Sequence, residues 1–94
     1  MVAIGRALMS SPKMIMFDEP SLGLAPKVVK SIFEMIVRIN KELGITVLLV
    51  EQNVQQSCQI SDQAFVIENG EVVIKGTGAE MLENDHVRRA YLGL

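Results

Sequence analysis

Two short apolar runs separated by a helical pattern constrain the fold of this chain more than any other feature. The runs are MIMF at residues 14–17 and ITVLLV at residues 45–50, and each has the length of a strand. Strand, helix and strand with short connections form a parallel, right-handed βαβ unit. Because continuous apolar runs are typical of strands in covered parallel sheets, we expect both strands to be buried, with Met14 and Met16 filling core space.

The segment between the runs has the pattern of an amphipathic helix over residues 27–43. Its apolar positions recur at helical spacing and leave charged side chains on the other side. The expected apolar stripe consists of Val28, Ile32, Ile36, Ile39 and Leu43, widened by Val29 and Phe33. Pro26 suits the first turn of this helix, and Gly44 is a natural stop.

The chain outside this unit contains weaker but recognisable signals. Residues 1–12 predict a short helix that stops before Pro12. Residues 51–62 are polar and predict a loop that leads into a short helix. Residues 64–76 predict a β-hairpin, because two apolar runs flank Asn69-Gly70.

Two short helices are expected at the end of the chain. Thr77 and Glu80 have the spacing of a capping box, and Asp85 can cap the second helix. His86 is then a solvated residue at a helix start rather than a metal ligand. The fold class expected from residues alone is therefore α/β, with a parallel βαβ unit, a hairpin and two C-terminal helices.

Composition excludes several classes of protein. The 94 residues suffice for one domain, and 49% of them are apolar, which is typical of globular chains. A net charge of -2 gives no basic surface for nucleic acid. No apolar run is long enough to span a bilayer. Cys58 is the single cysteine, so it predicts a reducing compartment such as the cytosol, and a packing role for this side chain.

The first apolar run ends in two carboxylates, Asp18 and Glu19, which is the form of a Walker B element. At the carboxyl end of a parallel strand the sheet opens into a crevice where phosphates and metal ions bind. There Asp18 could hold Mg²⁺, often through water, and Glu19 could orient the water that attacks the γ-phosphate of ATP. On this fragment alone, a strand leading into a capped helix is the more ordinary explanation.

The longer stretches around these carboxylates resemble the ATP-binding-cassette (ABC) ATPases. MIMFDEPSLGLAP is similar to that family's Walker B element and D-loop, and GRALMSSPKM to the helix after its signature sequence. VLLVEQN resembles the strand and switch loop, and VIENGEVVIKGT the C-terminal hairpin. HVRRAYLG resembles the tail of one subgroup, the ATPase subunits of branched-chain amino-acid importers. The resemblance covers essentially the whole chain.

The resemblance assigns roles to individual residues. Asp18 is similar to the Walker B aspartate, which binds Mg²⁺, and Glu19 to the catalytic glutamate. Gln52 occupies the switch position, where histidine is usual; it can donate a hydrogen bond to the γ-phosphate but carries no charge. The D-loop of residues 21–26 would meet a second subunit. Its expected interface residues are Ser21, Leu22, Gly23, Leu24 and Ala25, the last where many members have aspartate.

Two elements that this family needs do not occur in the 94 residues. These are the phosphate-binding string G-x-x-x-x-G-K-[ST] and the signature sequence LSGGQ. We therefore expect residues 1–94 to be the C-terminal part of a single ABC-type, P-loop nucleotide-binding domain. Without the phosphate-binding loop, the isolated chain is expected to lack ATPase activity. Because its strands would have lost their neighbours in the sheet, it is also expected to associate or aggregate.

The resemblance implies the ATP-hydrolysing subunit of an ABC importer, for branched-chain amino acids, with ATP and Mg²⁺ as cofactors. The implied partners are a second ATPase subunit in a head-to-tail dimer and transmembrane permease subunits, with no nucleic acid. The implied location is cytoplasmic, on the inner face of the cell membrane. An alternative is a truncated, non-catalytic module that pairs with an intact ATPase. A cassette ATPase of DNA repair or translation is less favoured, because those usually carry additional domains.

Overall fold

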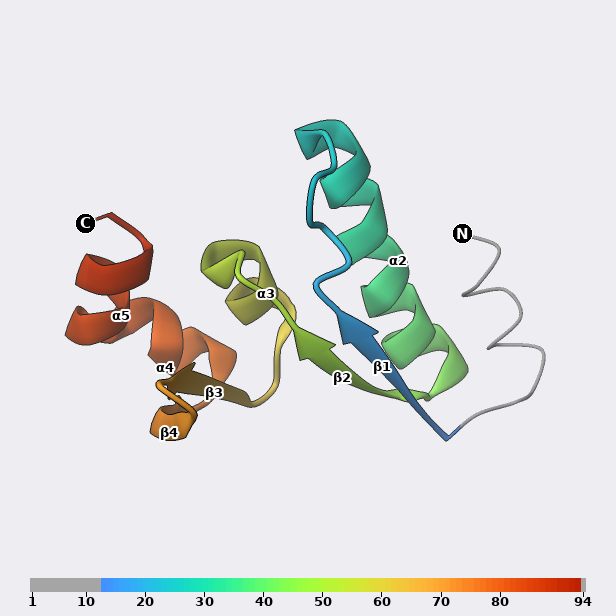
Figure 1. Cartoon of the computed structure of the whole chain (residues 1–94). Helices are drawn as coiled ribbons and strands as arrows, with labels where there is room; N and C mark the ends of the chain where they lie inside the picture. Colours follow the sequence, from blue (N-terminus) through green and yellow to red (C-terminus); the bar gives the residue numbers. More distant parts are fainter. Residues whose placement is uncertain (1–12, 94) are drawn as a thin grey trace. The chain divides into compact units, whose positions relative to one another are not determined.

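The computed structural model describes residues 13–93, which divide into two compact units after Gln52 (Figure 1). The helix expected in residues 1–12 lies outside the described residues. Within residues 13–93, no helix is both long enough and apolar enough to cross a membrane. The two units are described separately below.

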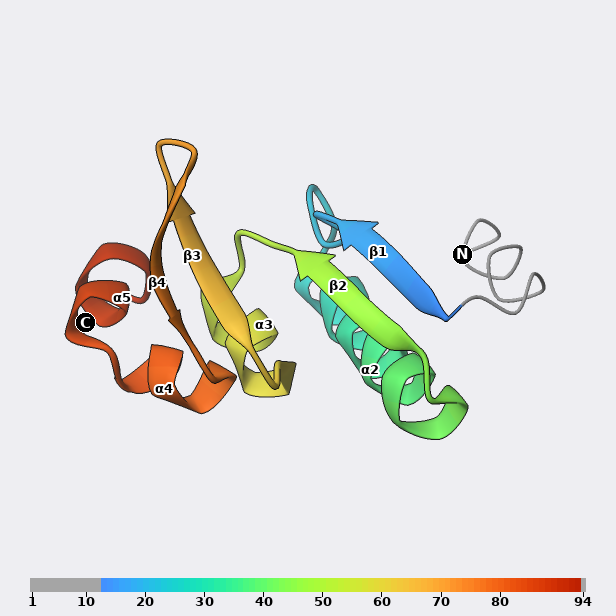
Figure 2. The same ribbon diagram turned by 90° about the horizontal axis from the view of Figure 1, so that it is seen from below.

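The first unit is the expected βαβ arrangement. It consists of β1 (Met14–Asp18), α2 (Pro26–Leu43) and β2 (Thr46–Val50). The strands pair in parallel, with Met14 opposite Thr46 and Asp18 opposite Val50. In Figures 1 and 2, α2 runs along one face of this two-stranded sheet.

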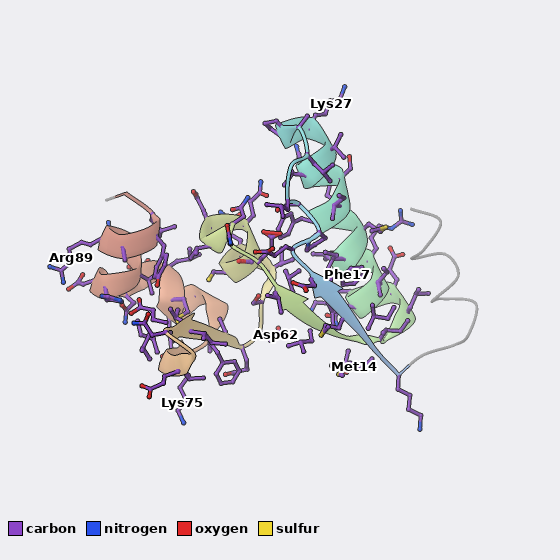
Figure 3. All side chains as sticks on the ribbon, in the orientation of Figure 1. Met14, Phe17, Lys27, Asp62, Lys75 and Arg89 are labelled. Atoms are coloured by element: carbon purple, nitrogen blue, oxygen red, sulfur yellow. The ribbon has the colours of Figure 1, made fainter. Side chains whose placement is uncertain are left out.

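A one-sided core holds the first unit together. Ile15 and Phe17 alternate with exposed residues along β1, so one face of the strand is buried. Figure 3 shows Phe17 in the crowded space between β1 and α2. The helix contributes the greater part of this core, namely Val29, Ile32, Phe33, Ile36 and Ile39.

The expectation that both strands are buried is wrong for the structure described here. Met14 is 58% exposed and Met16 61%, while Leu48 and Val50 on β2 are exposed to a similar extent. The reason is that α2 covers one face of the sheet, and these side chains point to the other face. An apolar run in a sequence indicates which residues could be buried, but not which face receives a partner.

The expected burial is also wrong at two positions of the helical stripe, Val28 and Leu43. Val28 is 46% exposed, because the buried stripe begins at Val29, one residue further on. Leu43 is 58% exposed at the last residue of α2, where Gly44 turns the chain away with φ = 67°. That turn confirms Gly44 as the helix stop, and Pro26 lies in the first turn as expected.

The second unit contains α3 (Val54–Ile60), β3 (Ala64–Glu68), β4 (Glu71–Gly76), α4 (Gly78–Glu83) and α5 (Asp85–Tyr91). The strands form the expected antiparallel hairpin, seen most clearly in Figure 2. Asn69 (φ = 52°) and Gly70 (φ = 78°) both have the positive φ that a type I′ turn requires.

Each helix of the second unit begins at a side-chain cap. Asn53 caps α3, and Thr77 with Glu80 forms the expected capping box at α4. The expected cap at Asp85 is wrong by one residue. The side chain of Asn84 accepts the backbone N–H of Val87 at 3.1 Å, and Asp85 is the first residue of α5.

The core of the second unit is built around Cys58, Met81 and Val87. This confirms Cys58 as a packing residue, and burial raises the pKa of its thiol. Sequence reasoning missed a close approach beside it. A Cβ at Gly78 would lie 2.1 Å from the carbonyl oxygen of Cys58 and 2.5 Å from that of Ser61. Only glycine therefore lets α4 begin against the end of α3.

Candidate functional site

The register of the parallel strands brings the predicted site residues to one edge of the sheet. Asp18 is paired with Val50, so the segments that follow β1 and β2 leave the sheet side by side. Glu19 follows the first strand, and Gln52 lies two residues beyond the second. Asp18 and Gln52 are exposed and Glu19 is half-buried. The three side chains predicted to act on the nucleotide therefore come from neighbouring strand ends.

The backbone turns sharply at Glu19. Its φ of 48° lies in the left-handed region, which is unfavourable for a residue with a side chain. The Glu19 N–H still donates to the carbonyl of Val50 at 2.7 Å, and its carbonyl accepts from Leu22 N–H at 3.1 Å. Strained residues of this kind persist where their surroundings hold them, and they are frequent at active sites.

Ser21 and Glu51 form a link that sequence reasoning missed. The Ser21 hydroxyl lies 2.5 Å from Oε1 and 2.8 Å from Oε2 of Glu51, and the Ser21 backbone N–H donates to Oε1 at 3.1 Å. The two residues are 30 positions apart, so only the parallel pairing of the strands brings them together. A sequence signal did exist, because Ser21 is itself a predicted interface residue and Glu51 immediately precedes the predicted site residue Gln52.

The predicted interface segment, residues 21–25, forms an exposed turn after the carboxylates. Leu22 is 67% exposed and Leu24 43%, and Gly23 has a φ of 74°. Leu24 N–H donates to the Ser21 carbonyl at 3.2 Å, which closes the turn. Ala25 then stands as the N-cap of α2 without a side-chain hydrogen bond to the helix. Exposed leucines on an ordered turn are available for contact with another chain.

The carboxylates at this edge suit Mg²⁺ but do not form a complete protein cage. Within residues 13–93, no group of three His, Cys, Asp or Glu side chains could hold a metal ion. Mg²⁺ is typically bound by one or two carboxylates together with substrate phosphates and water. The exposed carboxylate of Asp18 fits that mode of binding.

His86 belongs to a different cluster, on the surface of the second unit. Its Nε2 lies 2.9 Å from Oε1 of Glu68, and the hydroxyl of Tyr91 donates to the same oxygen at 2.5 Å. The hydrogen bond from Tyr91 is the main cause that lowers the pKa of Glu68, and the bond with His86 adds to it. This network joins α5 to the end of β3.

Comparison with curated proteins gives relatives that include ATP-binding proteins of transport systems. The chain is 56% identical over 93 residues to the high-affinity branched-chain amino acid transport ATP-binding protein BraG of Pseudomonas aeruginosa, covering 99% of this chain and 40% of BraG. It is 38% identical to the probable branched-chain amino acid transport ATP-binding protein LivF of Archaeoglobus fulgidus, covering all of this chain and 40% of LivF. The chain thus spans about 40% of the length of these relatives.

This segment is homologous to the ATP-binding subunits of ABC transporters, close to the branched-chain amino acid group. Transport systems with other cargo are also near it. The lipopolysaccharide export ATP-binding protein LptB of Escherichia coli is 36% identical over 98% of this chain and 38% of LptB. No family model matches the chain.

Solved structures confirm the fold. CbiO1 of Clostridium perfringens, part of the ABC transporter complex cbiONQ, matches with a TM-score of 0.81 and 34% identity over 94% of this chain and 35% of CbiO1. The ATP-binding cassette MJ1267 in its ADP conformation matches with a TM-score of 0.79 and 35% identity over 99% of this chain and 38% of MJ1267. The dimeric ATP-binding cassette MJ0796, in a post-hydrolysis state bound to ADP and Pi, matches with a TM-score of 0.70 and 29% identity. The match covers 81% of this chain and 32% of MJ0796.

Proposed function

We propose that this chain is the C-terminal part of the ATP-hydrolysing subunit of an ABC importer for branched-chain amino acids. The observation that carries the proposal is the register of the first unit, which brings Asp18, Glu19 and Gln52 to one sheet edge. The likeness to BraG and LivF supports the choice of cargo, since both are named for branched-chain amino acid transport.

Each of the three residues has a role that its chemistry allows. The Asp18 carboxylate would hold Mg²⁺, and bound Mg²⁺ would neutralise charge on the nucleotide phosphates. Glu19 would orient the attacking water and accept its proton. The Gln52 amide would donate a hydrogen bond to a γ-phosphate oxygen, which positions the phosphate without adding positive charge.

The partners follow from the exposed turn at residues 21–25. Leu22 and Leu24 are available to contact a second ATPase subunit, as the D-loop resemblance implies, and MJ0796 provides a relative that is dimeric with ADP and Pi. Permease subunits would be the other partners, and the protein would act on the cytoplasmic face of the membrane. The 94 residues carry no phosphate-binding loop, so we expect the isolated chain not to hydrolyse ATP.

The direct test is a chimeric ATPase in which this chain replaces the segment of BraG that aligns with it. We expect this chimera to hydrolyse ATP when reconstituted with the branched-chain permease subunits, and to drive leucine uptake into vesicles. Glu19→Gln should lower kcat by about 100-fold or more, because it removes the proton acceptor and retains the shape of the side chain.

Glu34→Gln is the matched control, since it removes an exposed carboxylate from α2 and should leave activity unchanged. A folded chimera that binds ATP without hydrolysing it would contradict the proposal. If the 94-residue chain instead co-purifies with intact BraG and adds no activity, the alternative of a non-catalytic pairing module is favoured.

A further inference from the structure

We infer that Glu51 is a positioning residue. Its carboxylate binds Ser21 and thereby fixes the turn after β1, which contains Glu19, against the end of β2, which leads to Gln52. The inference rests on the proposed ATP hydrolysis for its functional meaning. The link itself is a property of the fold, because both residues lie in the first unit and the contacts are within it.

The contacts join the same two segments at successive positions. Glu19 N–H donates to the Val50 carbonyl at 2.7 Å. Two residues further along the chain, Ser21 donates to Glu51 through both its backbone N–H and its hydroxyl. The turn after β1 is therefore attached to the end of β2 on both sides of Pro20. Glu51 immediately precedes Gln52, so the same attachment also fixes where the switch residue leaves the sheet.

The chemistry of the pair explains why a carboxylate serves this purpose. An ionised carboxylate is an acceptor at both oxygens, and hydrogen bonds to it are shorter and stronger than those between neutral groups. The hydroxyl of Ser21 lies within 2.8 Å of both oxygens, and the amide reaches one of them. Ser21 and Glu51 are both half-buried, which reduces competition from water.

The link between Ser21 and Glu51 can hold Glu19 in its strained backbone conformation. A residue with a φ of 48° tends to relax unless neighbouring contacts over-determine its conformation. Relaxation would move the Glu19 carboxylate relative to Gln52, and a displacement of about 1 Å can lower a rate by about two orders of magnitude. Glu51 therefore acts through Ser21 and Glu19, and it need not touch the nucleotide.

The link is tested first in the BraG chimera described above, by hydrogen exchange resolved by peptide, because the isolated 94-residue chain is expected to associate or aggregate. We compare Ser21→Ala and Glu51→Gln with the conservative variant Ser21→Thr, which retains both donors. The amides of residues 21–24 should exchange about tenfold faster in the first two variants and at the parent rate in Ser21→Thr. Exchange in the middle of α2 reports whether the unit remains folded. Unchanged exchange at residues 21–24 would overturn the inference.

The positioning role is tested in the BraG chimera described above. Ser21→Ala and Glu51→Gln should each lower kcat about tenfold with KM for ATP unchanged within about twofold, and the double variant should lose no more than either single variant. Ser21→Thr should retain parent activity. A change confined to KM, or fully additive losses, would overturn the positioning role. An unmodified chimera that fails to hydrolyse ATP would count against the proposed function, while the exchange experiment would still decide whether the link exists.

Discussion

The two units of this chain are stabilised in different ways. The second unit, residues 53–93, begins each of its helices at a side-chain cap, closes its hairpin with Asn69-Gly70 and surrounds a small core. The first unit has one helix on one face of two strands, an uncapped helix start at Ala25 and an open apolar face. The unit with local closure carries no predicted catalytic residue, whereas the open unit carries all of them. Local signals therefore determine structure in one unit, and long-range pairing creates the site in the other.

The largest effect that could break this contrast is expected at Gly78. Gly78→Ala places a methyl group 2.1 Å from the backbone carbonyl oxygen of Cys58, and a backbone atom cannot rotate away as a side chain can. We expect a loss of about 4 kcal/mol in stability, above the usual cost of one added methyl group, because α3 and α4 must separate.

Gly76→Ala is the matched control for that substitution. The atoms nearest to its Cβ would be side-chain atoms of Glu80, at 3.5 Å, which is ordinary contact. Urea unfolding measures the loss of stability, which we expect for Gly78→Ala alone. Peptide-resolved hydrogen exchange should locate the effect as faster exchange in residues 53–93 of that variant. Equal stability of the two variants would show that the approach of α3 and α4 is not tight.

The corresponding change in the first unit is Ile36→Ala. Ile36 is 3% exposed in the middle of the core face of α2, so its truncation should cost about 3 kcal/mol. Val28→Ala, at a position 46% exposed on the same helix, should cost less than about 1 kcal/mol. Urea titration of both variants measures the difference. A loss for Val28→Ala as large as that for Ile36→Ala would mean that Val28 belongs to the buried stripe, as the sequence pattern predicted, rather than to the exposed side of α2.

The sequence predicted the elements of both units because their signals are local. Helical spacing, the Asn69-Gly70 turn, the capping box at Thr77 and the stop at Gly44 each act within a few residues, and the structure confirms all four. Burial of Met14 and Met16 was predicted wrongly for the opposite reason. Whether a sheet face is covered depends on elements that the pattern of the strand itself does not specify.

The candidate site was predictable in part for the same physical reason. Asp18 and Glu19 follow an apolar strand, so their place at the edge of the sheet follows from the βαβ rule. The link between Ser21 and Glu51 depends on register, because a shift of one residue between β1 and β2 would separate them. Spacing along the chain does not reveal the register, and neither does it reveal the contact that makes Gly78 necessary.

The two units also differ in helix capping, and adding a cap to the first unit should have a smaller effect on stability. Ala25 is the N-cap of α2 and its side chain cannot accept a hydrogen bond from the first turn, unlike the caps of the second unit. Ala25→Ser should therefore stabilise the first unit by about 1 kcal/mol, provided that the serine oxygen reaches a free N–H of the first turn. Leu24→Ser, one residue earlier, introduces the same hydroxyl outside the cap position and should give no gain. Thermal unfolding of both variants measures the effect, and equal behaviour would rule out capping as its cause.

The smallest effect is expected from the surface network of Glu68, His86 and Tyr91. The hydrogen bond from Tyr91 is the largest cause that lowers the pKa of Glu68 below its ordinary value of 4.5. A carboxyl whose pKa is lowered by folding adds stability above pH 4.5, and that contribution disappears as the pH falls through the folded-state pKa. Tyr91 behaves in the opposite sense. Its pKa is raised above 10.0, so its contribution is present below pH 10.0 and is lost as the pH rises through the raised value.

Tyr91→Phe tests this assignment, because it removes only the hydroxyl. The pKa of Glu68, followed by NMR titration of its carboxyl carbon, should rise toward its ordinary value in this variant. It should rise less in His86→Asn, since the bond with His86 is the second cause in order of size. The difference in thermal stability between the parent chain and Tyr91→Phe should be greatest near pH 7 and should decrease toward pH 3. A difference that stays constant over this range would mean that the Tyr91 hydroxyl contributes without the charge of Glu68. The absence of any difference would leave packing of the two rings, whose centroids lie 6.3 Å apart and which Tyr91→Phe retains, as the contribution of this network.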